Sequence, residues 1–245
     1  PLPATNIDTV AGLERLASVV QGVQSVYETD ELSQILPVTI NSLNLGDKLN
    51  DEESFWVRSI SEHSRALAFL ITDGVHPSNE GRGYILRRLL RRAVYGAYKI
   101  GTTDSFLSSV VKSAISNSSN YYPAVKEQES LILDLVNNEE TRFQETLSKG
   151  IGMLDEQLLN LPNGEKLSGE EAFNLYDTHG LPLELVKEIA REKGIDIDEE
   201  GFKKNMESQQ QMSKASSSFV SKIPTAEDLK ETDFIGYEHM SSDSN

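Results

Sequence analysis

The sequence contains no cysteine, and this absence removes several classes of function. A chain without cysteine holds no disulfide framework, no thiolate-ligated zinc ion and no nucleophilic thiol. Its histidines do not pair at a spacing typical of metal ligands, so no metal site is predicted at His63, His76, His179 or His239. The lack of disulfides is compatible with the cytoplasm, where we expect the protein to act, and an organellar form stays open.

Long apolar runs are missing as well. No run approaches the roughly 20 residues that a membrane-spanning helix needs, so no membrane partner is expected. The hydrophobic content of 38% favours an open helical protein over a dense sheet enzyme. There is also no Walker motif, no complete dinucleotide-binding glycine pattern and no recognisable Ser/His/Asp arrangement.

Positive charge is scarce, with 23 Lys and Arg against 39 Asp and Glu and a net charge of -16. Residues 82–99 depart from this average, because they contain no acid and six basic side chains: Arg82, Arg87, Arg88, Arg91, Arg92 and Lys99. Such a segment inside an acidic chain indicates contact with a polyanion or with a very acidic protein partner.

Helical spacing divides this segment into two faces. The face expected to pack on a core carries Leu86, Leu89, Leu90, Ala93 and Ala97. The opposite face carries Tyr84, Arg87, Arg88, Arg91, Tyr95 and Tyr98. Guanidinium groups suit bidentate phosphate contacts and stack on aromatic rings. The alternative is a solvated face on which Arg stems cover neighbouring side chains.

The chain as a whole is predicted to be mainly α, like a helical bundle, with at most a small β hairpin near Pro162 and Gly164. Ser78 or Asn79 is expected to cap the basic helix, and Ser168 with Glu171 forms a capping box. Further helices are expected at residues 12–23, 28–46, 52–72, 104–116, 123–158 (one helix or a joined pair), 183–193 and 198–212.

Three segments in order resemble the class II alanyl-tRNA synthetases. They are IDTVAGLERLASVVQG (7–22), DGVHPSNEGRGYILRRLLRRAV (73–94) and AFNLYDTHGLPLELV (172–186). The resemblance implies that residues 1–27 end the class II catalytic domain and that residues 28–212 form a helical tRNA-recognition domain. It also implies that residues 213–245 hold a linker and the start of an editing domain. Because the chain begins without Met, we expect it to be part of a longer polypeptide.

The resemblance implies that the parent enzyme is an alanine–tRNA ligase, which activates alanine with ATP and Mg and transfers it to tRNA(Ala). Asp8 would contact the substrate ammonium, and Arg15 the ATP phosphate. The family has Gly-Met where this chain has Val10-Ala11, and motifs 1 and 2 are absent here. We therefore expect the chain alone to be inactive and to need no cofactor. Zinc is expected only in the editing domain, whose ligand motifs are absent.

The same resemblance assigns recognition of a G·U wobble pair in the tRNA(Ala) acceptor stem to Asn79 and Asp177. An RNA minor groove is wide and shallow, so short side chains reach base edges there. The wobble pair leaves a guanine amino donor unpaired, and a carboxylate or an amide oxygen accepts from it. Phosphate contacts are then expected from Arg82, Arg87, Arg88, Arg91, Arg92 and Tyr84.

Simpler interpretations stay open. Asn79 would then only cap a helix, and Asp177 would be only a turn residue before Gly180. The whole chain would be a noncatalytic RNA-binding relative, or a helical scaffold whose basic face binds an acidic protein.

Overall fold

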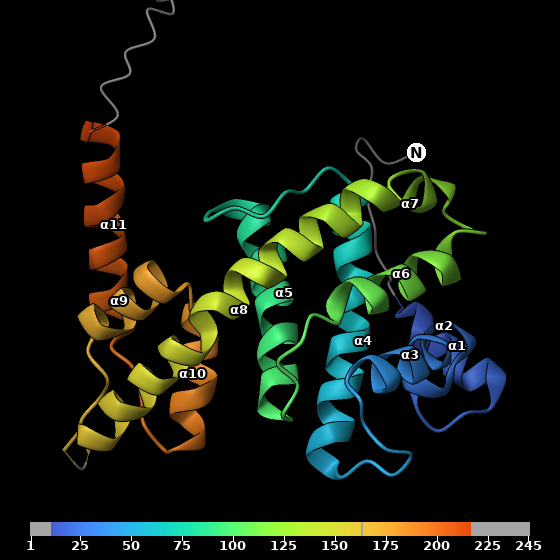
Figure 1. The fold of residues 1–245 in the computed structure, drawn as a ribbon, viewed down its shortest axis with the longest axis horizontal. Coiled ribbons are helices and arrows are strands. Elements are labelled where there is room, and N and C mark those ends of the chain that lie inside the picture. The colour runs from blue at the N-terminus through green and yellow to red at the C-terminus, as the bar shows by residue number, and fades with distance from the viewer. Residues whose placement is uncertain (1–10, 163, 217–245) are drawn as a thin grey trace, which may run out of the picture. The chain divides into compact units, whose positions relative to one another are not determined.

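The structure is a computed structural model that describes residues 11–162 and 164–216, and Figure 1 shows its fold. These residues are mainly α-helical and contain no strand, which confirms the mainly α prediction. No helix in the described ranges is long and apolar enough to cross a membrane. The chain divides into two compact units, residues 1–202 and 203–245. The domain limits expected at residues 27 and 212 stay a prediction.

The helices of the described residues are named here as in Figure 1. They are α1 (Leu13–Gln21), the 3-10 helix η1 (Val26–Glu28), α2 (Asp30–Ser33), α3 (Ile35–Ser42), α4 (Asp51–Thr72), α5 (Gly81–Lys99), α6 (Leu107–Ser118), α7 (Pro123–Glu127), α8 (Glu129–Asn160), α9 (Gly169–His179), α10 (Leu183–Glu192) and α11 (Glu199–Ser216).

Local signals account for both ends of α9. The Ser168 hydroxyl accepts from the Glu171 amide while Glu171 bonds back to Ser168, which confirms the predicted capping box of α9. Gly180 ends α9 with φ 67°, a left-handed conformation that glycine adopts at little cost. The helix expected over 123–158 is a joined pair, α7 and α8, separated at Gln128.

Two predictions about helix boundaries are wrong. The single helix expected over 28–46 is two helices, because Pro37 lacks the amide that would bond back to Ser33. The N-cap of α5 is Glu80, with no side-chain cap, rather than Ser78 or Asn79. The Ser78 hydroxyl instead donates to the Glu80 carbonyl.

The predicted hairpin is absent from the described residues. Leu167 forms an isolated parallel bridge with Ile197, in which the Leu167 amide donates to the Asp196 carbonyl at 2.9 Å. This bridge joins the segments that precede α9 and α11, so it links two distant parts of the chain rather than a local turn.

Helices α4 and α5 pack side by side at the centre of the first unit (Figure 1). A Cβ on Gly96 would lie 2.2 Å from the Trp56 ring, so only glycine permits this close approach. Tyr95, expected on the outer face of the basic helix, is only 4% exposed and meets Trp56 edge to face. That placement was wrong because α4 covers more of α5 than helical periodicity alone predicts.

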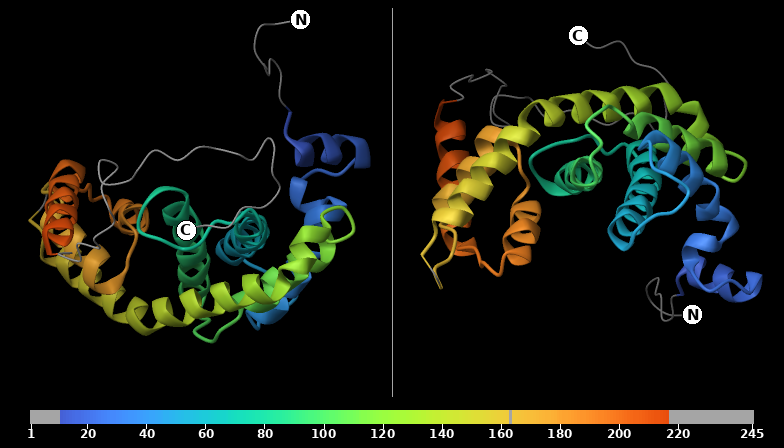
Figure 2. Two further views of the ribbon diagram at one scale, coloured as in Figure 1. Left: turned by 90° about the horizontal axis from the view of Figure 1, so that it is seen from above. Right: turned by 60° about the horizontal axis from the view of Figure 1, so that its bottom comes forward.

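Helix α8 contacts α4, α5, α6, α7 and α9, and Figure 2 shows it extending across α4 and α5. Its buried apolar side chains follow the predicted helical spacing: Ile132, Val136, Phe143, Leu147, Ile151, Leu154 and Leu158. Two adjacent acids on the same helix, Glu139 and Glu140, are buried too. Buried carboxylates need partners, and the partners of Glu139 lie on α5.

Candidate nucleic-acid interface

One side of α5 is paired with acids of α10. Arg88 lies 3.3 Å from Glu184, Arg92 lies 2.9 Å from Glu188, and Lys99 lies 2.5 Å from Glu192. The Tyr84 hydroxyl donates to Glu184, and burial raises the pKa of that hydroxyl above its usual value. The acidic partner that the basic segment indicated is therefore present within the chain itself. The regular four-residue spacing of these glutamates is the signal that would have revealed it.

Another side of α5 is paired with one buried acid of α8. The Glu139 carboxylate lies 3.0 Å from Arg87 Nε and accepts a 2.8 Å hydrogen bond from Arg91 Nε. The Glu139 side chain is only 6% exposed. Arg91 also lies over the Phe143 ring, 5.1 Å from its centroid. Burial lowers the pKa of Arg91, and the charge of Glu139 opposes that shift.

Asn79 and Asp177, the two expected base-reading residues, are both exposed. Asn79 does not cap α5, because its side-chain oxygen accepts a hydrogen bond from Arg87. Asp177 lies in the last turn of α9 rather than in the turn that follows it. Arg91 donates to the Gly180 carbonyl at the end of α9.

These contacts form a continuous chain, which we call the Glu139 network: Asn79, Arg87, Glu139, Arg91 and Gly180. One end of the network is an expected recognition residue. The other end is Gly180, which ends α9, the helix whose last turn contains Asp177. The sequence did not reveal this link, because Glu139 lies far from both segments along the chain.

Arg82 differs from the other arginines of α5. It is exposed and forms no ion pair with another residue that the structure describes, so its guanidinium group is available to solvent and to ligands. Of the basic residues in 82–99, it is the one whose placement best suits the predicted phosphate contact.

His63 of α4 lies beside the ion pairs that join α5 to α10, and no role was expected for it from the sequence. Its Nε2 lies 3.3 Å from an Arg92 nitrogen, at a cleft of about 310 Å³ between α5 and α10. Burial, together with the charges of Arg92 and Arg88, lowers the pKa of His63 to about 4. A neutral imidazole is therefore part of this interface at neutral pH.

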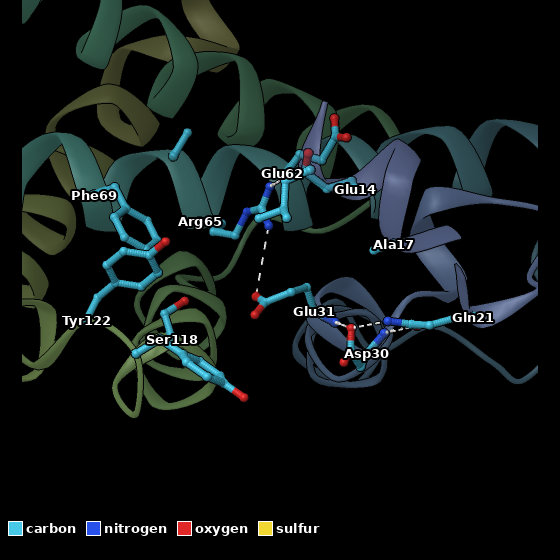
Figure 3. Close-up of a pocket in the computed structure, with 13 residues that line it drawn as sticks. Glu14, Ala17, Gln21, Asp30, Glu31, Glu62, Arg65, Phe69, Ser118 and Tyr122 are labelled. Atoms are coloured by element: carbon cyan, nitrogen blue, oxygen red, sulfur yellow. Dashed lines mark hydrogen bonds and ion pairs between the residues drawn. The ribbon is translucent and has the colours of Figure 1, made fainter. Parts of the chain in front are cut away.

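Helix α1 carries Arg15, which is exposed, whereas Asp8 and Val10 lie outside the described residues. Beside α1, a cavity of about 650 Å³ is lined by the carboxylates Glu14, Asp30, Glu31 and Glu62 around Arg65 (Figure 3). A hydrogen bond from the Glu14 backbone amide to its own carboxylate and the bond from Arg65 lower the pKa of the Glu14 carboxyl. Arg15 does not line this cavity, and its acidic lining does not suit a triphosphate.

Comparison with known proteins gives a consistent result. The family model described as "tRNA synthetases class II (A)" matches residues 1–245. Alanine–tRNA ligase of Nitratidesulfovibrio vulgaris is 41% identical over 249 residues, which cover 98% of this chain and 28% of that protein. The ligase of Myxococcus xanthus is 42% identical over 246 residues, covering 97% of this chain and 27% of that protein. The chain thus spans less than a third of the length of these relatives.

Proposed function

The chain belongs to the class II alanyl-tRNA synthetase family, and from this premise we propose that it binds the acceptor stem of tRNA(Ala) and reads its G·U wobble pair. The observation that carries the proposal is the placement of Asn79 and Asp177. Both side chains are exposed, and neither residue is the cap of its helix. The Glu139 network joins the segments that carry them.

The chemistry of the two residues suits a wobble pair in the minor groove. Asp177 offers a carboxylate that accepts from the unpaired guanine amino group, and Asn79 offers an amide that both donates and accepts. Each such contact is worth about 1–3 kcal/mol of discrimination, by analogy with base readout in DNA. The pair therefore supplies specificity, while charge supplies affinity.

Phosphate contact is divided unequally among the basic residues. We assign the direct contact to Arg82, whose guanidinium group has no ion pair. Arg88 and Arg92 contact phosphate only if it displaces Glu184 and Glu188, and Tyr84 is likewise bonded to Glu184. Arg87 and Arg91 act by holding the recognition segments, because both form ion pairs with buried Glu139.

The activity of the parent protein is part of the proposal. With the rest of the polypeptide, the chain serves an alanine–tRNA ligase that uses ATP and Mg in the cytoplasm. We assign to Arg15, which is exposed, the contact with a phosphate of ATP that the remainder of the catalytic domain binds. Asp8 is assigned the substrate ammonium. No nucleotide pocket is formed by α1 and the acidic cavity beside it, so the described residues contribute Arg15 and not a complete site.

A second candidate is a noncatalytic module that binds RNA or protein through its helices. The observation that favours it is the neutralisation of α5 by α10, which leaves fewer free cations than the sequence indicates. Binding of an acceptor stem at low salt would exclude a module that binds only protein, and preference for the G·U stem separates the first candidate from a nonspecific RNA-binding module.

The test is binding of the full-length polypeptide to two acceptor-stem hairpins, one with the G·U pair and one with G·C, across a salt series. We expect preference for the wobble stem, and we expect Asn79→Ala or Asp177→Ala to reduce it by about 5- to 100-fold. Equal loss of affinity for both stems would contradict the assignment of base readout to these residues.

A further inference from the structure

Glu139 has a position that the proposed function does not by itself require. It lies in the first half of α8, has a side chain that is 6% exposed, and interacts with two guanidinium groups through one carboxylate oxygen. Two arginines on one acid leave a net positive charge in a partly buried place, which is an unusual way to join two helices. Apolar contacts already pack α8 on the core, through residues such as Val136 and Phe143.

The two arginines lead in different directions. Arg87 donates to the side-chain oxygen of Asn79, in the loop before α5. Arg91 donates to the carbonyl of Gly180, three residues after Asp177. A Cβ on Gly180 would lie 2.5 Å from an Arg91 guanidinium nitrogen, so a larger residue there would displace the end of the Arg91 side chain. Glu139 is thus the point at which the two recognition segments are connected.

The next residue, Glu140, provides a comparison within the same helix. It is equally buried, but its carboxylate accepts from the Phe106 and Leu107 amides at the start of α6. Within the described residues, no hydrogen bond or ion pair joins Glu140 to either recognition segment. Burial and charge are therefore shared by the two acids, and only their connections differ.

We propose that Glu139 is a positioning residue that sets the spacing of Asn79 and Asp177 for wobble-pair recognition; this rests on the function proposed above. Its charge holds Arg87 and Arg91 together, and these hold the Asn79 side chain and the end of α9. Loss of the charge lets both arginines move, so the two polar groups no longer meet one base pair together. Phosphate contacts through Arg82 are unaffected.

The experiment uses Glu139→Gln in the full-length polypeptide, with binding to the G·U and G·C stems measured side by side. The amide oxygen of glutamine still accepts from Arg91, so the helix packing is retained. We expect the ratio of the two affinities to fall about tenfold, with affinity for the G·C stem changed less than about twofold. Glu140→Gln is the matched control and is expected to leave the ratio unchanged.

A double variant tests the connection itself. Asn79→Ala in the Glu139→Gln background is expected to reduce the ratio little further, because both changes disrupt one unit. Arg87→Lys is the second single variant. Lysine keeps a positive charge beside the Glu139 carboxylate, but it lacks the planar guanidinium fork that also reaches Asn79. This variant is therefore expected to lower the affinity ratio too.

The outcomes separate the two proposals. If Asn79→Ala lowers the ratio but Glu139→Gln and Arg87→Lys do not, Glu139 is purely structural and the positioning role is overturned. Equal loss of affinity for both stems in Glu139→Gln overturns it as well. If neither Asn79→Ala nor Asp177→Ala changes the ratio, the proposed readout itself fails.

Discussion

Two sides of α5 use the same residue type in different surroundings. Toward α10, Arg88 and Arg92 pair with acids that water reaches, since the Glu184 side chain is 44% exposed. Toward α8, Arg87 and Arg91 share Glu139, which is 6% exposed. Exposed ion pairs contribute little stability and exchange readily with other anions, whereas breaking a buried pair leaves an uncompensated charge. One side is thus suited to exchange partners and the other to hold a fixed geometry.

The largest effect is expected from removing the buried acid. Glu139→Ala should lower the free energy of unfolding by about 3–5 kcal/mol, because Arg91 is left buried without its partner. Glu184→Ala, the control on the α10 side, should cost less than about 1 kcal/mol, because the Glu184 side chain is 44% exposed. Urea unfolding of both variants measures the difference. Similar losses in the two variants would remove the distinction between the two sides.

A pH titration sharpens the comparison at the α10 side. The pKa of His63 is lowered to about 4 in the folded protein, so between pH 6.5 and 4 the unfolded state binds more protons. The contribution of His63 to the free energy of unfolding is therefore complete above pH 6.5. It is lost as the pH falls toward 4, by up to about 3 kcal/mol. His63→Gln should flatten this part of the unfolding curve relative to the unaltered protein. An unchanged slope would place the imidazole in contact with solvent.

Exchange at the α10 side is tested by freeing its arginines. The double change Glu184→Gln and Glu188→Gln should strengthen binding of both acceptor stems alike. It should also steepen the salt dependence by about one unit for each arginine that gains a phosphate. Binding isotherms across a salt series measure both effects. Unchanged affinity would mean that Arg88 and Arg92 do not meet RNA even when they are unpaired.

The smallest effect is expected from a single exposed residue. Arg82→Ala should weaken binding of both stems by the same few-fold factor and reduce the salt slope by about one. Its stability should stay within about 0.5 kcal/mol, since the side chain is exposed and has no ion pair. A change in the ratio between G·U and G·C stems would instead give Arg82 a part in base readout.

Much of the fold follows from local patterns. The capping box of Ser168 and Glu171, the glycine end at Gly180 and the spacing of apolar residues on α8 were each predictable. The capping hydrogen bonds join residues a few positions apart, and the apolar spacing repeats within one helix, so a short window of sequence contains each of these signals. The starts of α3 and α5 were missed because other groups engaged the expected capping residues or proline interrupted the helix.

The candidate site was only partly predictable. The basic segment and the residues Asn79 and Asp177 were found from composition and from family motifs. The ion-pair partners of the arginines could not be predicted, since Glu139 lies 48 positions from Arg91 and Glu188 lies 96 positions from Arg92. Tyr95 was placed on the wrong face for the same reason, because Trp56 of another helix covers it.

The sequence by itself determined the helices, the family and the presence of a basic segment, because these depend on neighbouring residues and on motifs. Only the tertiary structure decided which charges are open to a ligand and which are held inside. Burial and partner choice depend on long-range packing, and the strength of an ion pair depends on how much water that packing excludes. In this chain, the packing of α5 leaves Arg82 exposed and pairs Arg88 and Arg92 with acids of α10 that water reaches. The same packing pairs Arg87 and Arg91 with buried Glu139.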